Sequence, residues 1–231
     1  MASIISAGTS TGTAIAISGD TTGNLAFQTQ AGANTITVPN ATGTMLTTAS
    51  AGTTGTSMVL LGSATANSSA TIDFTSIANS SYSAYKIIGY NIYPVTNGAN
   101  LLLRVSVGGT FQSGGSDYRD IQHRFLPAGG AYSGGTSSGI RVNSPGDTLA
   151  NSANSGTQGG CVFDMTFYNA SQTNTVKRAT WNSSYYGSDY LDCLGSGTYL
   201  TAGNAVDGFR FLMDTGNIST GTFFLYGIKN A

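Results

Sequence analysis

Residues 205–229 read AVDGFRFLM-DTGNIST-GTFFLYGIK, and this stretch decides what kind of fold the chain adopts. Two apolar runs of strand length, 205–213 and 221–229, flank a polar loop that contains glycine. This pattern predicts an antiparallel pair of strands in an all-β domain. Large apolar side chains alternate along both runs, so four of them are expected to face the core or a subunit interface: Phe209, Phe211, Phe223 and Leu225.

The composition of the whole chain also indicates an all-β protein. Of 231 residues only 8% are charged, against roughly 25% in an average domain, and glutamate is absent. Exposed helices are normally built from Glu, Lys, Ala, Leu and Arg, which lose little rotamer freedom in a helix. With 32 Gly and abundant Ser, Thr and Asn, the surface is expected to consist of strands and turns covered by uncharged polar groups.

Charge and hydropathy argue against two classes of partner. The formal net charge is −1, so no basic field exists to collect nucleic acid or an anionic membrane surface. The most apolar windows, 58–61 and 87–92, are far too short to span a bilayer. The first residues lack the Lys or Arg that opens a secretory signal, so we expect the mature protein to begin at or near Met1.

The N-terminal segment, residues 1–57, differs from the rest of the chain. It carries one charge, Asp20, and short alternating runs are separated by turn clusters at a spacing of about ten residues. So few large side chains cannot offset the backbone entropy of the segment on its own. We therefore expect an intertwined β-stem that shares a core between chains, with strands at 13–17, 25–28, 35–38 and 44–46, and with a linker at 47–57.

Residues 58–231 are predicted to form an antiparallel jelly-roll-like β-sandwich. Two of the strongest strands, 85–93 and 101–107, are joined by a loop with an Asn97-Gly98 pair, which predicts a hairpin between them. No helical periodicity interrupts the series of strands. The expected strands are 58–66, 70–75, 84–95, 100–107, 119–126, 138–143, 160–169, 175–183, 189–194, 205–213 and 221–229.

No catalytic or metal site is expected. The single histidine, His123, lies on a predicted strand, and the Gly135–Gly139 match to G-x-S-x-G is followed by a predicted strand instead of the helix that the motif requires. The aspartate pairs Asp117/Asp120 and Asp189/Asp192 lack an apolar neighbourhood that would raise the pKa of one carboxyl. Without a D-x-D-x-D-G run, calcium binding is also disfavoured. We therefore expect a protein that is not an enzyme and needs no cofactor.

The two cysteines, Cys161 and Cys193, lie 32 residues apart and are expected to be small buried hydrophobes in strands. A disulfide between them would need suitable pairing geometry and an oxidising compartment, and the sequence leaves that alternative open.

The aromatic residues are the best candidates for contact with a ligand. Tyr and Trp displayed with Asn, Ser and Asp offer flat apolar faces and fixed hydrogen-bonding groups, as sugar-binding and protein-binding surfaces do. The alternative is that these residues pack in the core or between subunits. The candidate receptor-binding residues, expected in rim loops, are Tyr118, Tyr132, Trp181, Tyr185 and Tyr186.

Two parts of the sequence resemble a known group of proteins. Residues 32–45, GANTITVPNATGTM, resemble segments of bacteriophage tail-fibre and other virion appendage proteins. The C-terminal part is similar to a β-domain that recurs in phage structural proteins, on the residues 70–75 (ATIDFT), 85–94 (YKIIGYNIYP), 209–211 (FRF), 216–222 (GNISTGT) and 226–228 (YGI). The resemblance implies a virion structural component, typically a homotrimer exposed on the particle, with no catalytic residues.

Taken together, these features predict a trimeric phage fibre. Residues 1–57 would attach it to other virion proteins, and residues 58–231 would meet a host-surface glycan or protein. A capsid decoration or head-fibre protein, bound to the shell through residues 1–57, is the alternative. A tailspike-type depolymerase and a cellular carbohydrate-binding module are less well supported, because a convincing acid pair and a secretory signal, respectively, are missing.

Overall fold

The structure is a computed structural model that describes residues 58–77, 81–127, 129–144 and 146–229, together with the backbone of two short strands, β1 (Leu25–Gln28) and β2 (Thr35–Val38). The chain divides into two compact units, Met1–Gly55 and Thr56–Ala231. In the first unit, β1 and β2 pair antiparallel with Phe27 opposite Ile36, which confirms the two strands predicted there. The other predicted strands of residues 1–57, and the predicted linker, lie outside the described residues.

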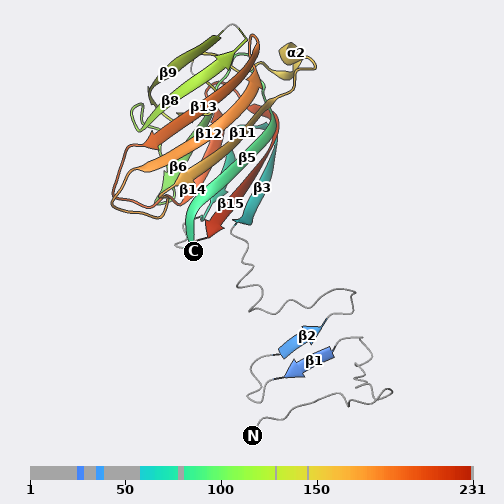
Figure 1. The fold of residues 1–231 in the computed structure, drawn as a ribbon, viewed down its shortest axis with the longest axis vertical. Coiled ribbons are helices and arrows are strands. Elements are labelled where there is room, and N and C mark those ends of the chain that lie inside the picture. Colours follow the sequence, from blue (N-terminus) through green and yellow to red (C-terminus); the bar gives the residue numbers. More distant parts are fainter. Residues whose placement is uncertain are drawn as a thin grey trace. The chain divides into compact units, whose positions relative to one another are not determined.

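The second unit contains two antiparallel sheets (Figure 1), and its all-β class is as predicted. The larger sheet has eight strands in the spatial order β3 (Met58–Ser69), β15 (Ile218–Lys229), β5 (Tyr82–Pro94), β11 (Cys161–Tyr168), β12 (Lys177–Tyr186), β13 (Tyr190–Tyr199), β8 (Tyr118–Leu126) and β9 (Gly129–Ser137). The smaller sheet has the order β10 (Ile140–Arg141), β6 (Leu101–Val107), β14 (Gly208–Met213) and β4 (Ile72–Thr75), with β7 (Thr110–Phe111) paired to β6.

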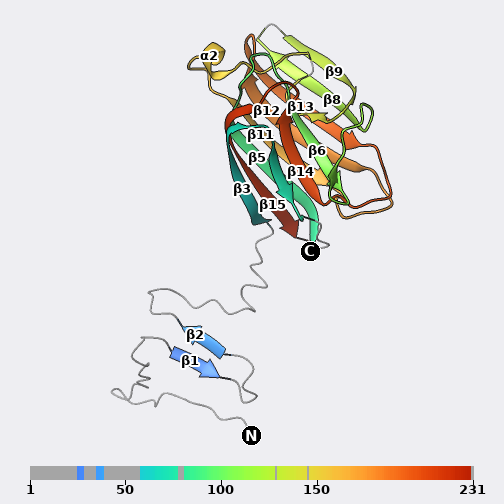
Figure 2. The ribbon, with the colours of Figure 1, turned by 180° about the vertical axis from the view of Figure 1, so that it is seen from behind.

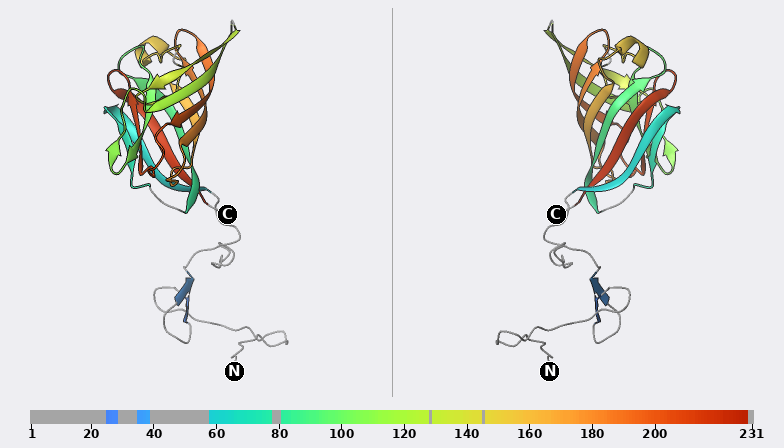
Figure 3. Two further views of the ribbon diagram at one scale, coloured as in Figure 1. Left: turned by 90° about the vertical axis from the view of Figure 1, so that its left-hand side faces the viewer. Right: turned by 90° about the vertical axis from the view of Figure 1, so that its right-hand side faces the viewer.

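The smaller sheet covers one face of the larger one. Seen from behind in Figure 2, β6 and β14 lie in front of the strands of the larger sheet, and the side views of Figure 3 show the two layers edge-on. One short helix, α2 (Ser152–Ser155), begins after Asn151, whose side-chain oxygen accepts a hydrogen bond from the Asn154 N–H. Because the smaller sheet covers one face of the larger sheet, the larger sheet has one face packed against the core and one outer face.

The predicted pairing of the two closing strands is wrong. β14 hydrogen-bonds to β6 and β4 in the smaller sheet, whereas β15 hydrogen-bonds to β3 and β5 in the larger sheet. The segment between them crosses from one sheet to the other instead of forming a hairpin. It is held there because the Asp214 N–H donates to the Asn100 carbonyl at 2.9 Å and the Val95 N–H donates to the Asn217 carbonyl at 2.9 Å.

The hairpin predicted around Asn97-Gly98 is wrong for the same reason. β5 belongs to the larger sheet and β6 to the smaller one, so the segment 95–100 is a second crossover. Gly98 adopts a left-handed φ of 84°, and its N–H donates to the Leu149 carbonyl at 3.0 Å. Glycine therefore supplies a turn here, as the sequence suggests, but the turn directs the chain between layers.

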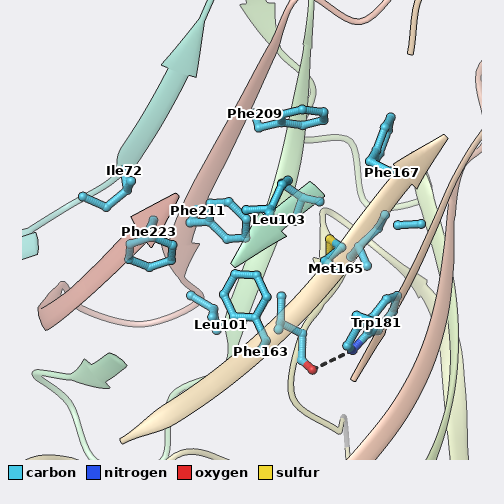
Figure 4. Close-up of a cluster of buried hydrophobic side chains, with 14 of the residues drawn as sticks. Ile72, Leu101, Leu103, Phe163, Met165, Phe167, Trp181, Phe209, Phe211 and Phe223 are labelled. Carbon is cyan, nitrogen blue, oxygen red and sulfur yellow. Dashed lines mark hydrogen bonds between the residues drawn. The ribbon is translucent and has the colours of Figure 1, made fainter. Parts of the chain in front are cut away.

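Aromatic rings from both sheets fill the core (Figure 4). Phe211 of β14 lies 5.3 Å from Phe163 of β11 and 5.1 Å from Phe223 of β15, measured between ring centroids. Phe209 contacts Phe167 edge-on at 4.9 Å. The residues predicted to face the core from the two closing strands are all buried. Crossing between sheets is what allows the two closing strands to bury their apolar faces against each other.

The two cysteines are buried in β11 and β13, as predicted, and both are free. Burial raises the pKa of the Cys161 thiol to about 12 and that of the Cys193 thiol to about 11. They lie on strands separated by β12, and the Cys193 Sγ–H contacts the Gln122 side-chain oxygen at 2.9 Å.

Candidate functional site

The outer face of the larger sheet presents rows of side chains that run across the strands. One row passes through seven consecutive pairings, because each residue is the register partner of the next: Ser63, Phe224, Ile88, Asp164, Asn182, Leu194, His123 and Tyr132. A neighbouring row, two residues along the strands, contains Val162, Ser184, Asp192 and Phe125. These rows bring together residues that lie far apart in the sequence.

Two hollows lie along these rows. The larger has a volume of about 580 Å³ and extends from Ile88 and Tyr90 on β5 to Phe125 on β8. The smaller, of about 440 Å³, extends from Thr166 on β11 to Tyr132 on β9. Both are lined by three of the same residues, Asp164, Asn182 and Leu194, so they join into one depression, which we call the outer groove.

The outer groove combines apolar and polar side chains, because Ile88, Val162 and Leu194 line the larger hollow beside the polar residues of β12. Asn182, Ser184 and Thr180 project from β12, where they alternate with buried residues. Within the part of the chain that the structure describes, the side chains of Asn182, Ser184 and Asp192 form no hydrogen bond to the protein. Their amide, hydroxyl and carboxylate groups are therefore available to a ligand.

The two carboxylates of the outer groove differ in their surroundings. Asp164, whose side chain is 51% exposed, forms an ion pair with Lys86 of β5. No lysine or arginine lines either hollow among the described residues, and Asp192 forms no ion pair with any of them. Asp192 therefore gives the groove one uncompensated negative charge.

Aromatic and aliphatic side chains form the walls. Tyr90, 40% exposed, stacks on Phe224 with ring centroids 5.9 Å apart and an interplanar angle of 25°. At the other end Tyr132, 81% exposed, stacks on His123 at 4.4 Å with an angle of 20°. Each tyrosine ring thus has a partner ring that fixes its orientation while part of the tyrosine side chain stays exposed.

The structure corrects the expected placement of the candidate residues, because all five lie in strands instead of rim loops. Three of them are also buried: Tyr118, Trp181 and Tyr185. The Tyr118 hydroxyl accepts from the Val105 N–H at 2.9 Å and donates to the Gln112 carbonyl at 3.0 Å. Burial raises the pKa of both the Tyr118 and the Tyr185 hydroxyl well above the ordinary value.

Trp181 and Tyr185 connect β12 to the segment that follows β10. The Trp181 indole N–H donates to the Val142 carbonyl at 2.8 Å, and the Tyr185 hydroxyl accepts from the Ser144 N–H at 3.0 Å (Figure 4 shows the indole hydrogen bond). These two aromatic side chains are buried and form interior hydrogen bonds, so they cannot contact a receptor. Their burial follows from strand alternation, since β12 continues to Tyr186, three residues beyond the predicted end at residue 183.

The remaining two candidates lie at the surface. Tyr132 is part of the outer groove, and Tyr186 is partly exposed beside Tyr190, whose ring it meets edge-on at 5.4 Å. A receptor-binding role for both stays a prediction. The other residues of the outer groove were not predicted from the sequence, among them Tyr90, Val162, Asn182 and Leu194. The alternation W-N-S-S-Y-Y places Asn182 and Ser184 outside whenever Trp181 is inside, and this signal could have found them.

The residues considered for catalysis have structural surroundings. Asp120 is fully buried and accepts hydrogen bonds from Arg141 and Gln122, and the Asp117 carboxylate accepts from the Gly114 N–H. The Gly135–Gly139 segment spans the end of β9 and the approach to β10, without a following helix. No group of three potential metal ligands occurs among the described residues.

Comparison with protein-family models, with curated proteins and with solved structures gives no match for this chain. In the described part of the chain no helix has the length and apolar character needed to cross a membrane.

Proposed function

We propose that this protein is a phage virion structural protein: a trimeric fibre whose C-terminal sandwich, a jelly-roll type of head, is exposed for recognition of the host surface, with a glycan as the ligand. Residues 1–57 would form the intertwined β-stem and attach the fibre to other virion proteins. The observation that carries the proposal is the outer groove, which combines oriented aromatic rings with unpaired polar groups.

The position of the groove in the sandwich supports exposure to a host. The chain enters the sandwich at Met58, whose register partner on β15 is Ile228. The row of register partners through these two residues continues to Tyr168 on β11. Asp164 and Val162 lie four and six residues along β11 from that row. The larger hollow therefore lies several residues along the strands from the point where the chain enters the sandwich.

The free edge of the larger sheet supports an oligomer. β3 is an edge strand of 12 residues with no charged residue and no proline, the devices by which proteins usually protect an edge. Met58, Leu60 and Leu61 are 44%, 53% and 37% exposed at its start, close to the segment that is expected to share a core between chains. A neighbouring subunit would cover these side chains.

The surroundings of the groove carboxylates support binding instead of hydrolysis. A glycosidase acid needs an apolar, desolvated site that raises its pKa, whereas Asp164 is paired with Lys86 and half-exposed, and Asp192 is exposed. Incubation with host polysaccharide should therefore release no new reducing ends. Their appearance would replace this proposal with a tailspike-type depolymerase.

Three measurements test the proposal. The native mass of the full chain should be three times that of one chain, and a monomer would contradict the shared stem. Labelled antibodies should bind to intact particles at the tail, whereas binding over the shell would favour the capsid decoration alternative, and no binding would refute a virion role. The purified protein should compete with the phage for adsorption to host cells.

A further inference from the structure

We propose that the outer groove binds a neutral oligosaccharide of several sugars, laid across the strands of the larger sheet between two aromatic platforms, Tyr90 at one end and Tyr132 at the other. This inference rests on the proposed function and adds to it the chemical class, the length and the direction of the ligand.

The separation of the platforms sets the length. Tyr90 is on β5 and Tyr132 is on β9, and the order β5, β11, β12, β13, β8, β9 places five strand spacings between them. At 4.7–4.9 Å for each spacing, their backbones are about 24 Å apart. A single sugar ring cannot contact both rings, so a ligand that uses both platforms is a chain of sugars.

The platforms are built to receive the apolar faces of sugar rings. Tyr90 is held by Phe224, and Tyr132 is held by His123, which also meets Phe125 edge-on at 4.3 Å. Because stacking fixes both tyrosines before binding, little side-chain entropy is lost when a ligand covers them. Aromatic rings in such sites contribute through contact area and orientation.

Part of the floor between the platforms matches the hydroxyl groups of a sugar, and Val162 and Leu194 add apolar contact area beside it. Asn182 and Ser184 offer an amide and a hydroxyl without partners in the described part of the chain, and Thr166, Thr180 and Ser196 extend the hydroxyl row in the smaller hollow. These groups both donate and accept, as sugar hydroxyls do, so the row is complementary to a chain of neutral sugars.

The charge of the groove selects against acidic sugars. Asp192 is unpaired, Asp164 is neutralised by Lys86, and no lysine or arginine lines either hollow in the described residues. A uronic acid or a sulfated sugar would place like charges close together in a partly desolvated depression, which is unfavourable. The ligand class is therefore neutral.

The experiment measures binding of the full chain to an array of immobilised oligosaccharides. The array contains oligomers of glucose, galactose, mannose and N-acetylglucosamine, from monosaccharide to hexasaccharide, and oligogalacturonates of the same lengths. We expect binding to at least one neutral series, rising with length until both platforms are occupied, and no comparable binding to the oligogalacturonates.

Variants assign the binding to the groove. Tyr90→Ala and Tyr132→Ala should each weaken binding of the longest bound oligomer about tenfold, the equivalent of one lost stacking contact. The control is Tyr168→Ala, because Tyr168 is also an outer-face tyrosine that is 40% exposed but lies outside the groove. Asp192→Asn should increase binding of oligogalacturonates, relative to binding of the neutral oligomers, by roughly tenfold. Circular dichroism shows whether each variant is folded.

Each outcome decides the inference. Binding to oligogalacturonates alone, binding without dependence on length, equal losses in Tyr90→Ala and Tyr168→Ala, or no binding to any array member would overturn it. If the protein still competes for phage adsorption in those cases, the proposed function stands and only the ligand assignment fails. If neutral oligosaccharides bind at the groove but the protein is absent from particles, the binding site stands and the virion role fails.

Discussion

Phe211 of β14 and Phe223 of β15 meet across the two layers of the sandwich, with ring centroids 5.1 Å apart and planes inclined by 34°. Only four residues, 214–217, separate β14 from β15 in the sequence, yet the two strands belong to different sheets. This contact joins the sheets at the centre of the core, where Phe163 also packs against both rings.

Truncation of either ring should strongly destabilise the sandwich. Phe211→Ala and Phe223→Ala remove fully buried aromatic side chains, and each is expected to lower the free energy of unfolding by about 3–5 kcal/mol. The double variant should show a coupling of about 0.5–1.5 kcal/mol, because the rings contact each other. Phe125→Ala, at a ring that is 42% exposed, serves as the control and should cost less than about 1 kcal/mol. Urea unfolding gives all four values, and equal effects at the three positions would contradict the assigned core.

Tyr118 and Tyr132 should separate stability from binding. Tyr118→Phe removes the acceptor of the Val105 N–H, so it should lower the free energy of unfolding by about 1–3 kcal/mol and leave host adsorption unchanged. Tyr132→Ala removes an exposed ring, so it should change stability by less than about 0.5 kcal/mol and weaken adsorption. The opposite pattern, with adsorption lost only in Tyr118→Phe, would mean that the outer groove is not the contact surface.

Two arginine–aspartate pairs should differ in their effect on stability. Arg141→Met leaves the carboxylate of Asp120, which is fully buried, without its charged partner, and should cost about 3 kcal/mol. Arg210→Met breaks a two-hydrogen-bond pair with Asp73 in which both side chains are 29% exposed, and should cost about 1 kcal/mol or less. Thermal unfolding of both variants tests the difference. A larger loss for Arg210→Met would show that burial of Asp120 does not control the effect.

The buried thiols should make the protein sensitive to alkaline pH. The pKa of Cys161 is raised from 9.0 to about 12 and that of Cys193 from 9.0 to about 11, so the folded state keeps protons that the unfolded state releases. The stabilisation is complete below pH 9 and is lost as pH rises from there toward the folded pKa values, by up to about 1.4 kcal/mol per pH unit for each thiol. Urea unfolding between pH 7 and pH 10 should show this decline.

A Cys161→Ala/Cys193→Ala variant isolates the contribution of the thiols, because Tyr118 and Tyr185 also have raised pKa values and keep their protons in the folded state at higher pH. The decline between pH 9 and pH 10 should be shallower in this variant than in the parent. A thiol reagent at pH 8 should modify the folded parent far more slowly than the unfolded chain, since both thiols are buried and protonated. Rapid modification of the folded protein would contradict this placement.

The sequence predicted which residues face inward better than which strands are neighbours. Alternation identified Phe209, Phe211, Phe223 and Leu225 as buried, because the side-chain period of a strand is a local property. It could not show that β14 and β15 lie in different sheets, because both a hairpin and a crossover bury the same alternate residues. Strand pairing depends on contacts across the whole domain.

β9 and the outer groove show two other limits. β9 contains four glycines, Gly129, Gly130, Gly134 and Gly135, so its composition has low strand propensity, and its pairing with β8 holds it in place. The groove was missed because its rows join β5, β11, β12, β13, β8 and β9, an order that does not follow the sequence. Of the predicted aromatic residues, Tyr132 exposes its ring at the smaller hollow, and the buried Trp181 also borders that hollow.

Along β12, residues that face the interior alternate with residues that face outward, so substitutions at the two sets have different effects. The side chains of Trp181, Ser183 and Tyr185 pack in the interior, whereas those of Asn182, Ser184 and Tyr186 face outward. Substitutions at neighbouring positions therefore affect either stability or surface chemistry. Mutations at the outward positions can diversify the surface while the interior stays intact. A library that randomises only those positions, with their row partners Asp164, Asp192 and Leu194, would retain the scaffold and supply new specificities.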